Sequence, residues 1–263
     1  MVLIESENNK LIKHIKSLDT KKGRDKHDSF IIEGEKFVDS IPHKLEIESY
    51  VLSQTMYSKV DIEKYSSRAK TYVIKDSIFK SISDTIEPQG IFAICKKVKY
   101  ALSDVLDTSR PLFILMIEES SDPGNLGTII RTAESAGACG VLVSENSVDL
   151  YNKKVLRATA GAIFHIPIVE NVDLIDACKI FKSHGVEIVA THLKGAISPY
   201  DINLQKDCAV VVGNESRGVS DKLIENIDHI VKIPMIGDSE SLNVSVASGI
   251  LLYEVVRQRL KKI

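Results

Sequence analysis

The strongest constraint on the fold is a set of short, almost entirely apolar runs within residues 111–212. The first, Pro111–Ile117 (PLFILMI), is typical of a strand buried on both faces. Gly140–Val143, Val186–Ala190 and Cys208–Val212 share that character, with helical patterns between the runs, near 125–136 and 171–183. Buried strands that alternate with helices predict a parallel sheet with right-handed crossovers. We therefore expect an α/β domain over 111–263.

A second, smaller α/β domain is predicted over residues 1–97, followed by a polar linker over 98–110. Apolar residues recur at helical spacing between Leu11 and Leu18. Short apolar segments predict strands at 30–32, 50–52, 71–74 and 91–94. With 263 residues, 44% of them hydrophobic, the chain is long and apolar enough to build both cores without metal or disulfide support.

Composition excludes several classes of protein. No apolar run approaches the ~18 residues of a membrane span, and the N-terminus has no signal-peptide pattern, so we expect a cytoplasmic protein without a membrane partner. The four cysteines include no CxxC pair, which argues against a zinc ribbon or a dithiol redox motif. Free thiols are the simplest interpretation, with two disulfides as the alternative. The cysteines are Cys95, Cys139, Cys178 and Cys208.

Positive charge is concentrated near the N-terminus, although the net charge of the chain is only −2. The stretch Lys10–Lys26 holds seven basic residues against Asp19 and Asp25. A basic arm on a nearly neutral protein suits a phosphate backbone, whereas the alternative is an ordinary solvated surface.

Four polar segments follow strands of the larger domain, where open α/β sheets bind ligands. The first runs from Asp122 to Gly127 and is followed by Arg131. Its GxxG spacing argues against a dinucleotide fold, which needs GxGxxG. Asn125 at a helix start predicts an anion or hydrogen-bond site, with a Pro-Gly turn as the alternative. Arg131 stands among apolar residues, where an arginine usually pairs or extends its charged end to water.

The next two segments are Lys154–Ile168 and Gly213–Gly218. In the former, small residues after Arg157 predict close packing, and His165 is interpreted as a core histidine. The latter imitates a P-loop, but Val219 replaces the required lysine, which disfavours an ATPase. Glu215 suits a proton acceptor or a hydrogen-bond anchor, and a solvated side chain is the alternative.

The fourth segment consists of Ile233–Met235 and, after a short loop, Ser241–Ala247. It leads into a long helix predicted over Ser241–Leu260. Ser239 or Ser241 is expected to cap that helix, with Asn243 and Ser245 offering hydrogen-bonding groups at its start. An apolar stripe at helical spacing suits either a core helix or a dimer face. Its members are Leu242, Val246, Ile250, Tyr253 and Val256.

These segments resemble the SpoU/TrmH family of RNA ribose 2′-O-methyltransferases, within the SPOUT superfamily. The likeness lies in DPGNLGTIIRTAESAGA (122–138), GNESRGVS (213–220) and IPMIGDSESLNVSVASGILLYEVVRQ (233–258), in the family's order, with KVLRATAGAIFHIPI as a weaker fourth segment. It covers about 111–260. FIIEGEKFVDS (30–40) and PQGIFAI (88–94) resemble the L30e-like substrate-binding domain of ribosomal-RNA members.

The resemblance implies a trefoil-knotted methyltransferase domain that binds S-adenosylmethionine, works as a homodimer and binds structured RNA. Ribosomal RNA, 23S above all, is favoured through the N-terminal likeness. A transfer-RNA methyltransferase and an inactive RNA-binding relative are the alternatives. The implied cofactor contacts are Thr191, Leu193, Gly213, Ile233, Ser241, Leu242 and Asn243.

Residue roles follow from the resemblance and from the chemistry of methyl transfer. Sulfur leaves a sulfonium as a neutral group, so no metal is needed. The resemblance implies that Arg131 acts on the 2′-hydroxyl, as a base or as a hydrogen-bond donor. Because an arginine is essentially always protonated, hydrogen bonding to the hydroxyl and anchoring of a phosphate are the preferred roles. Glu215 is expected to orient Arg131 or to accept the proton, while Asn125, Asn243 and Ser245 hold the hydroxyl and cofactor. The expected RNA contacts are Lys21, Lys22, Arg24, Lys26 and Arg157.

Overall fold

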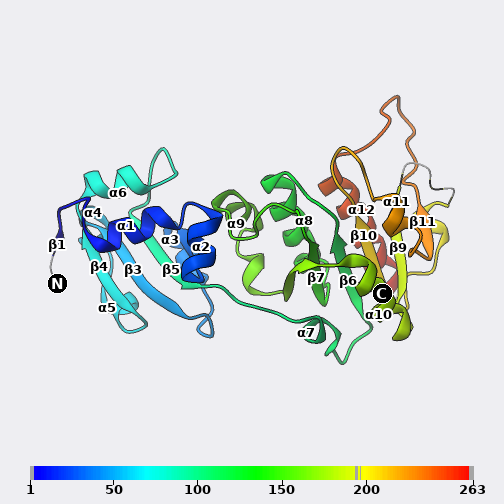
Figure 1. Cartoon of the computed structure of the whole chain (residues 1–263), viewed down its shortest axis with the longest axis horizontal. Coiled ribbons are helices and arrows are strands. Elements are labelled where there is room, and N and C mark those ends of the chain that lie inside the picture. The colour runs from blue at the N-terminus through cyan, green and yellow to red at the C-terminus, as the bar shows by residue number, and fades with distance from the viewer. Residues whose placement is uncertain (1–2, 193–194, 196, 261–263) are drawn as a thin grey trace. The chain divides into compact units, whose positions relative to one another are not determined.

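The computed structural model describes residues 3–192, 195 and 197–260, and the chain divides into two compact units (Figure 1). Unit 1 comprises Met1–Val98 and Tyr151–Leu156, and unit 2 comprises Lys99–Leu150 and Arg157–Ile263. Each unit contains its own β-sheet with helices packed against it. The predicted α/β class, with a parallel sheet in the larger part, is confirmed.

Unit 1 is built on a mixed five-stranded sheet of order β1-β4-β3-β5-β2. The strands β1, β4 and β3 run parallel, whereas β5 is antiparallel to both β3 and β2. The four strands predicted in this part are present, and β1 is additional. Their bounds are β1 Leu3–Ile4, β2 Ser29–Glu33, β3 Ile47–Ser53, β4 Lys70–Ile74 and β5 Ile91–Lys96.

Two helices, α1 (Lys10–Ser17) and α6 (Asp76–Ile82), close one face of this sheet. Ile12 and Ile15 of α1 and Phe79 of α6 belong to one buried cluster with apolar side chains of β2, β3, β4 and β5. The side chain of Asn9 caps α1 by accepting from the Leu11 N–H. The remaining helices of unit 1 are α2 Lys21–His27, α3 Glu35–Asp39, α4 Gln54–Tyr57 and α5 Glu63–Ser66.

Unit 1 is not one continuous stretch of chain, because it includes Tyr151–Leu156. The Tyr151 hydroxyl donates to the carbonyl of Val98 (2.9 Å) and accepts from its N–H (3.1 Å). The Lys153 ammonium, on a side chain only 11% exposed, pairs with Asp19 (2.5 Å) and lies 3.8 Å from Asp84. A peptide ending at residue 97 therefore lacks part of this unit.

Unit 2 is built on a six-stranded sheet of order β11-β9-β10-β6-β7-β8, in which every adjacent pair is parallel. The continuous apolar runs occupy its interior, since β6, β7 and β10 are buried at every residue. The bounds are β6 Phe113–Ile117, β7 Gly140–Ser144, β8 Ile168–Val172, β9 Glu187–Thr191, β10 Cys208–Val212 and β11 His229–Val231.

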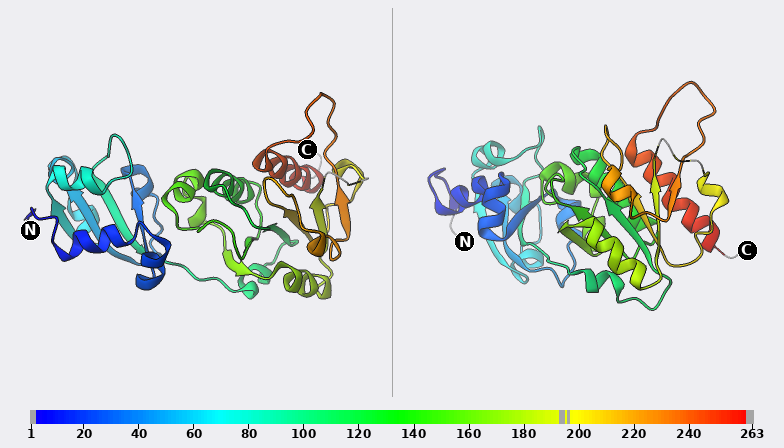
Figure 2. Two further views of the ribbon diagram at one scale, coloured as in Figure 1. Left: turned by 45° about the horizontal axis from the view of Figure 1, so that its top comes forward. Right: turned by 45° about the vertical axis from the view of Figure 1, so that its right-hand side comes forward.

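Helices cover both faces of this sheet (Figure 2). On one face, α7 (Leu102–Leu106), α10 (Leu174–Ser183) and α11 (Asp221–Ile224) contribute Val105, Phe181 and Leu223 to a shared core cluster. On the other, α8 (Pro123–Ser135) packs against α12 (Val244–Arg259). The predicted linker 98–110 therefore includes α7, whose Val105 would lie 2.6 Å from any Cβ at Gly140. The shorter elements are α9 Lys153–Thr159, η1 Ala162–Phe164 and η2 Pro199–Asp201.

Three local expectations were wrong. The helix predicted over 171–183 begins only at Leu174, and the preceding Ile168–Val172 is β8. This edge strand (IVENV) is polar at its end, so it lacks the apolar run that marked the central strands. His165, interpreted as a core residue, is exposed. The last helix is capped by Asn243, which accepts from the Ser245 N–H, and not by Ser239 or Ser241.

The last helix also buries a different face from the predicted stripe. Leu251, Leu252 and Val255 are fully buried, whereas Val246 and Tyr253 are each 51% exposed. Because α12 is apolar on two faces, its sequence alone did not reveal which face the core covers.

The cysteine side chains are free and buried, as the simplest interpretation predicted. Within the described part of the chain, no helix is both long and apolar enough to cross a membrane.

Candidate active site and cofactor cavity

The polar segments meet at the edge of the unit 2 sheet where its parallel strands end. The neighbouring strands β6 and β10 are followed by the loops 118–122 and 213–220. From β6 the chain goes on to β7 on one side, while β9 and β11 lie on the other side beyond β10. Such a switch point opens a crevice between loops, and in open α/β sheets ligands bind there.

Glu215 holds these two loops together. Its carboxylate accepts hydrogen bonds from the Ser120 hydroxyl (3.0 Å), the Ser121 N–H (3.1 Å) and hydroxyl (2.8 Å), and the Asp122 N–H (3.2 Å). Burial raises the pKa of this carboxyl, but the backbone and hydroxyl donors outweigh burial and lower the pKa from 4.5 to about 2. The carboxylate is therefore ionised at neutral pH and is a very weak base.

A chain of hydrogen bonds extends from Glu215 to the start of α12. The Asn125 amide donates to Glu215 (3.4 Å), and the Asn243 amide donates to the Asn125 side-chain oxygen (3.0 Å). The Asn243 oxygen in turn accepts from the N–H (2.8 Å) and hydroxyl (2.5 Å) of Ser245. Four of the five residues predicted to act in catalysis thus form one connected group.

Arg131 stands apart from this group. It lies on α8 beyond Asn125, its side chain is exposed, and no ion pair or hydrogen bond joins it to Glu215 among the described residues. The expectation that Glu215 orients Arg131 is therefore wrong, because the carboxylate is occupied by the Ser120–Asp122 loop and Asn125. The low pKa also argues against Glu215 as the proton acceptor.

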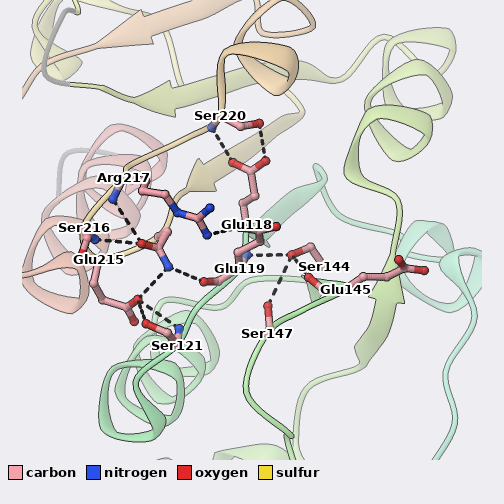
Figure 3. A network of polar contacts seen from close by, with 11 residues as sticks. Glu118, Glu119, Ser121, Ser144, Glu145, Ser147, Glu215, Ser216, Arg217 and Ser220 are labelled. Atoms are coloured by element: carbon pink, nitrogen blue, oxygen red, sulfur yellow. Dashed lines mark hydrogen bonds and ion pairs between the residues drawn. The ribbon is translucent and has the colours of Figure 1, made fainter.

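Further contacts, which the sequence motifs did not indicate, fasten the same two loops (Figure 3). The Glu118 carboxylate accepts from the Ser220 N–H (2.7 Å) and hydroxyl (2.6 Å). The Asn214 amide donates to the Glu119 carbonyl (2.8 Å), and Arg217 forms an ion pair with Glu119. The signal available was the charged run Glu118-Glu119 directly after a buried strand.

Beside this network lies a cavity of about 680 Å³, a size typical of small-molecule sites. Of the seven residues predicted to contact the cofactor, five line it. Leu193 lies outside the described residues, and Asn243 is joined to Asn125 instead of the cavity wall. The five lining residues are Thr191, Gly213, Ile233, Ser241 and Leu242.

The cavity walls suit an adenosyl sulfonium. Val231, Ile233 and Leu242 offer apolar surface for a purine ring, and carboxylates such as Glu119 and Glu240 suit a cationic ligand. Gly213 lets the 213–218 loop fold tightly, since a Cβ there would lie 2.1 Å from the Gly218 carbonyl carbon. Within the described residues, no group of three His, Cys, Asp or Glu side chains has the arrangement to hold a metal ion.

The basic residues predicted to bind RNA differ in their exposure. Lys21, Lys22 and Lys26 are exposed on α2. Arg24 is only 4% exposed and donates to the carbonyl of Leu18 at the end of α1 (2.7 Å), so it supports the fold and is not an RNA contact. Arg157 is exposed at the end of α9.

Comparison with known proteins identifies the family. Residues 112–253 match the SpoU rRNA Methylase family, and residues 9–93 match the MRM3-like substrate binding domain. The chain belongs to the SpoU rRNA methylase family. The family predicted from the sequence motifs is confirmed, as is the N-terminal substrate-binding domain.

Relatives of this methylase resemble it along nearly the whole chain. It is 36% identical to the 23S rRNA (guanosine(2553)-2′-O)-methyltransferase RlmP of Bacillus subtilis, over 97% of this chain and 99% of that one. It is 33% identical to a 23S rRNA (guanosine-2′-O-)-methyltransferase RlmB of Burkholderia, covering 75% and 81%. The structure of an AdoMet-bound rRNA methyltransferase from Sinorhizobium meliloti superposes with a TM-score of 0.87, at 30% identity and 99% coverage of both chains.

These matches confirm an RNA methyltransferase that uses S-adenosylmethionine. The two-unit α/β arrangement also agrees with the solved rRNA methyltransferase. The loops of the predicted trefoil knot map to Thr191–Leu193, Gly213, Ile233 and Ser241–Asn243, and of these Leu193 lies outside the described residues.

Proposed function

We propose that this methyltransferase transfers a methyl group from S-adenosylmethionine to a ribose 2′-hydroxyl of 23S ribosomal RNA. The observation that carries the proposal is the hydrogen-bonded chain from Glu215 through Asn125 and Asn243 to Ser245, beside the cavity. The 36% identity to RlmP over nearly the full length of both proteins supports the choice of 23S RNA and of the 2′-oxygen.

The reaction needs a positioned hydroxyl and a bound methyl donor. S-adenosylmethionine, when bound, supplies the methyl group on a positively charged sulfur. The ribose oxygen forms the new bond to the methyl carbon, the carbon–sulfur electron pair stays on sulfur as a neutral thioether, and the hydroxyl proton leaves to solvent. In-line geometry is the main requirement, so residues that fix the ribose carry much of the rate.

We assign the amide and hydroxyl groups of Asn125, Asn243 and Ser245 to holding the ribose and the cofactor. Arg131 is assigned to the RNA, where its guanidinium donates to the 2′-oxygen or to an adjacent phosphate. Glu215 is a positioning residue, because its carboxylate fixes Asn125 and the loop before α8.

The exposed lysines of α2 are proposed to bind RNA phosphates. The acidic residues of the same basic stretch are engaged elsewhere, because Asp19 pairs with Lys153 and Asp25 with Lys97. Replacing Lys21, Lys22 and Lys26 together by alanine is expected to raise the RNA Kd roughly tenfold and to flatten its salt dependence. Filter binding at several salt concentrations measures both quantities.

The matched control removes the same charge from other exposed positions of unit 1. A triple alanine variant at Lys44, Lys59 and Lys80 is expected to bind RNA like the wild type. Equal losses in the two triple variants would show that net charge alone, and not the α2 surface, governs binding.

We also propose that the protein is a homodimer that uses the exposed face of α12, with RNA bound across the two subunits. Val246 and Tyr253 lie two turns apart on this face, and each is 51% exposed. Val246→Glu is expected to raise the dimer Kd by roughly 100-fold, because a charge would be buried without a partner. Sedimentation velocity over a concentration series measures this shift.

The control for the dimer is Ile180→Glu on α10, where the replaced side chain is 39% exposed. This variant should sediment like the wild type. A wild-type protein that is monomeric at every concentration would refute the dimer.

The competing substrate is transfer RNA, and the comparison with 23S RNA is direct. Methyl transfer is measured with purified unmethylated 23S RNA, 16S RNA and transfer RNA under the same conditions. The proposal predicts incorporation into 23S RNA alone, and incorporation confined to transfer RNA would refute it.

We further propose that unit 1 selects the RNA and that residues 111–263 catalyse the transfer. We also propose that the protein works in the cytoplasm.

A further inference from the structure

One charged pair on the cavity wall has no role in the mechanism above. Arg217 and Glu119 both line the cavity, and their side chains form an ion pair (Figure 3). The Arg217 side chain is 71% exposed and that of Glu119 is 34% exposed. An exposed pair of this kind adds little to stability, so its position at the cavity calls for another explanation.

The backbone of Glu119 is held in a strained conformation. Its φ is +48°, in the left-handed region that side chains other than those of glycine, asparagine and aspartate rarely adopt. The strain is fixed from both sides, since the Glu119 N–H donates to the Ser144 hydroxyl (2.8 Å) and its carbonyl accepts from Asn214 (2.8 Å). Strain kept at a ligand cavity indicates that the side chain in that place is needed.

Arg217, in the 213–220 loop, is held both at its backbone and at the end of its side chain. Its N–H donates to the Asn214 side-chain oxygen (3.2 Å), and the next residue pairs with Asn214 through two backbone hydrogen bonds. At the other end, one terminal nitrogen of the guanidinium binds Glu119. A guanidinium has five donors in a planar fork, so donors remain for a ligand in the cavity.

The charges of the cavity wall show which ligand group these donors suit. The acidic residues Glu118, Glu119, Glu215, Asp221 and Glu240 line it, against the basic residues Arg217 and Lys232. Acidic walls favour the sulfonium and amino groups of S-adenosylmethionine, but they repel its carboxylate. That carboxylate needs a fixed cation, and a guanidinium binds a carboxylate through two parallel hydrogen bonds.

We propose that Arg217 binds the carboxylate of the methionine part of S-adenosylmethionine, with Glu119 holding the guanidinium in the cavity wall. The proposal rests on this cavity being the cofactor site. Arg217 is preferred over Lys232 because its side chain is anchored to Glu119 and its planar fork matches a carboxylate, whereas lysine is a flexible point charge.

The test compares two ligands that differ in the carboxylate alone. Calorimetry without RNA gives the Kd of S-adenosylmethionine and of decarboxylated S-adenosylmethionine for the wild type, Arg217→Gln, Arg217→Lys and Lys232→Gln. The ratio of the two Kd values measures the preference for the carboxylate. Arg217→Gln is expected to reduce this preference roughly tenfold or more, and Arg217→Lys is expected to reduce it less.

Lys232→Gln is the matched control, because it removes one positive charge from the same cavity wall. It should change the preference much less than Arg217→Gln does. Equal changes in the two variants would overturn the proposal, because they would show a general charge effect. An unchanged preference in Arg217→Gln together with weaker RNA binding would overturn it in favour of an RNA phosphate contact. Absence of cofactor binding to the wild type would instead refute the proposed function itself.

Discussion

Arg131→Ala is expected to lower the turnover of RNA methylation by about 10²- to 10³-fold. The side chain is exposed on α8 and has no ion pair or hydrogen-bond partner within the described residues, so its removal leaves the fold intact. It does not line the cavity, so the Kd of S-adenosylmethionine should stay unchanged. Single-turnover methyl transfer and calorimetry separate these two effects.

Two further variants make the Arg131 experiment specific. Ser135→Ala changes an exposed residue one turn farther along α8 and should methylate RNA at the wild-type rate. Arg131→Lys keeps the charge but loses the planar fork, so it should recover only part of the rate. Wild-type turnover in Arg131→Ala would remove this residue from the mechanism.

Glu215→Gln is expected to lower both stability and turnover. The substitution replaces one carboxylate oxygen, an acceptor, by an NH2 group, a donor. That NH2 group then faces groups that are themselves donors, such as the N–H groups of Ser121 and Asp122. Each donor that loses its acceptor costs about 1–3 kcal/mol, which corresponds here to a Tm lower by about 2–12 °C. Turnover falls with stability because Asn125 loses its fixed partner. Circular dichroism melting and methyl-transfer rates test the two parts.

The effect of Glu215→Gln on the Tm should also depend on pH, in a direction that the pKa of Glu215 defines. Hydrogen bonds hold the pKa of Glu215 at about 2, below its ordinary value of 4.5. A lowered pKa in the folded state contributes stability that is complete above the unfolded value and is lost as the pH falls towards the folded value. The Tm difference between wild type and Glu215→Gln should therefore be constant from pH 8 to about 5 and shrink below about 4.5.

Glu145→Gln provides the control for both Glu215 measurements. Glu145 is exposed in the loop after β7 (Figure 3), so this change should leave the Tm and its pH dependence unaltered. A Glu215→Gln protein with the wild-type Tm and a reduced turnover would contradict a positioning role and indicate a direct part in the chemistry.

The central strands were predictable because burial on both faces imposes a continuous apolar sequence. The run at 113–117 is buried at every residue, and the runs at 140–144 and 208–212 behave in the same way. The edge strand β8 was missed because a strand exposed on one side carries polar residues and loses that pattern. Which face of α12 packs against the core was equally ambiguous, since apolar residues occupy both its core face and its exposed face.

The sequence was sufficient to predict which residues form the site, but only some of the hydrogen bonds between them. Motif spacing indicated Asn125, Glu215 and Asn243, and the structure joins them by hydrogen bonds. The sequence did not show that Glu215 is bound to the 120–122 loop and not to Arg131, because the two loops meet only through the strand order of the sheet. Arg24 was misassigned for a similar reason, since charge alone does not reveal that its guanidinium ends at a backbone carbonyl.

Ribose methylation of 23S RNA is tested by methyl transfer from labelled S-adenosylmethionine to unmethylated total RNA, followed by fractionation and nucleoside analysis. We expect the label in one 2′-O-methylated nucleoside at a single position of 23S RNA. Label on a base would contradict the proposed chemistry, and label confined to transfer RNA would contradict the proposed substrate. Absence of label from every RNA, with S-adenosylmethionine still bound by the protein, would contradict catalysis and support an inactive RNA-binding relative.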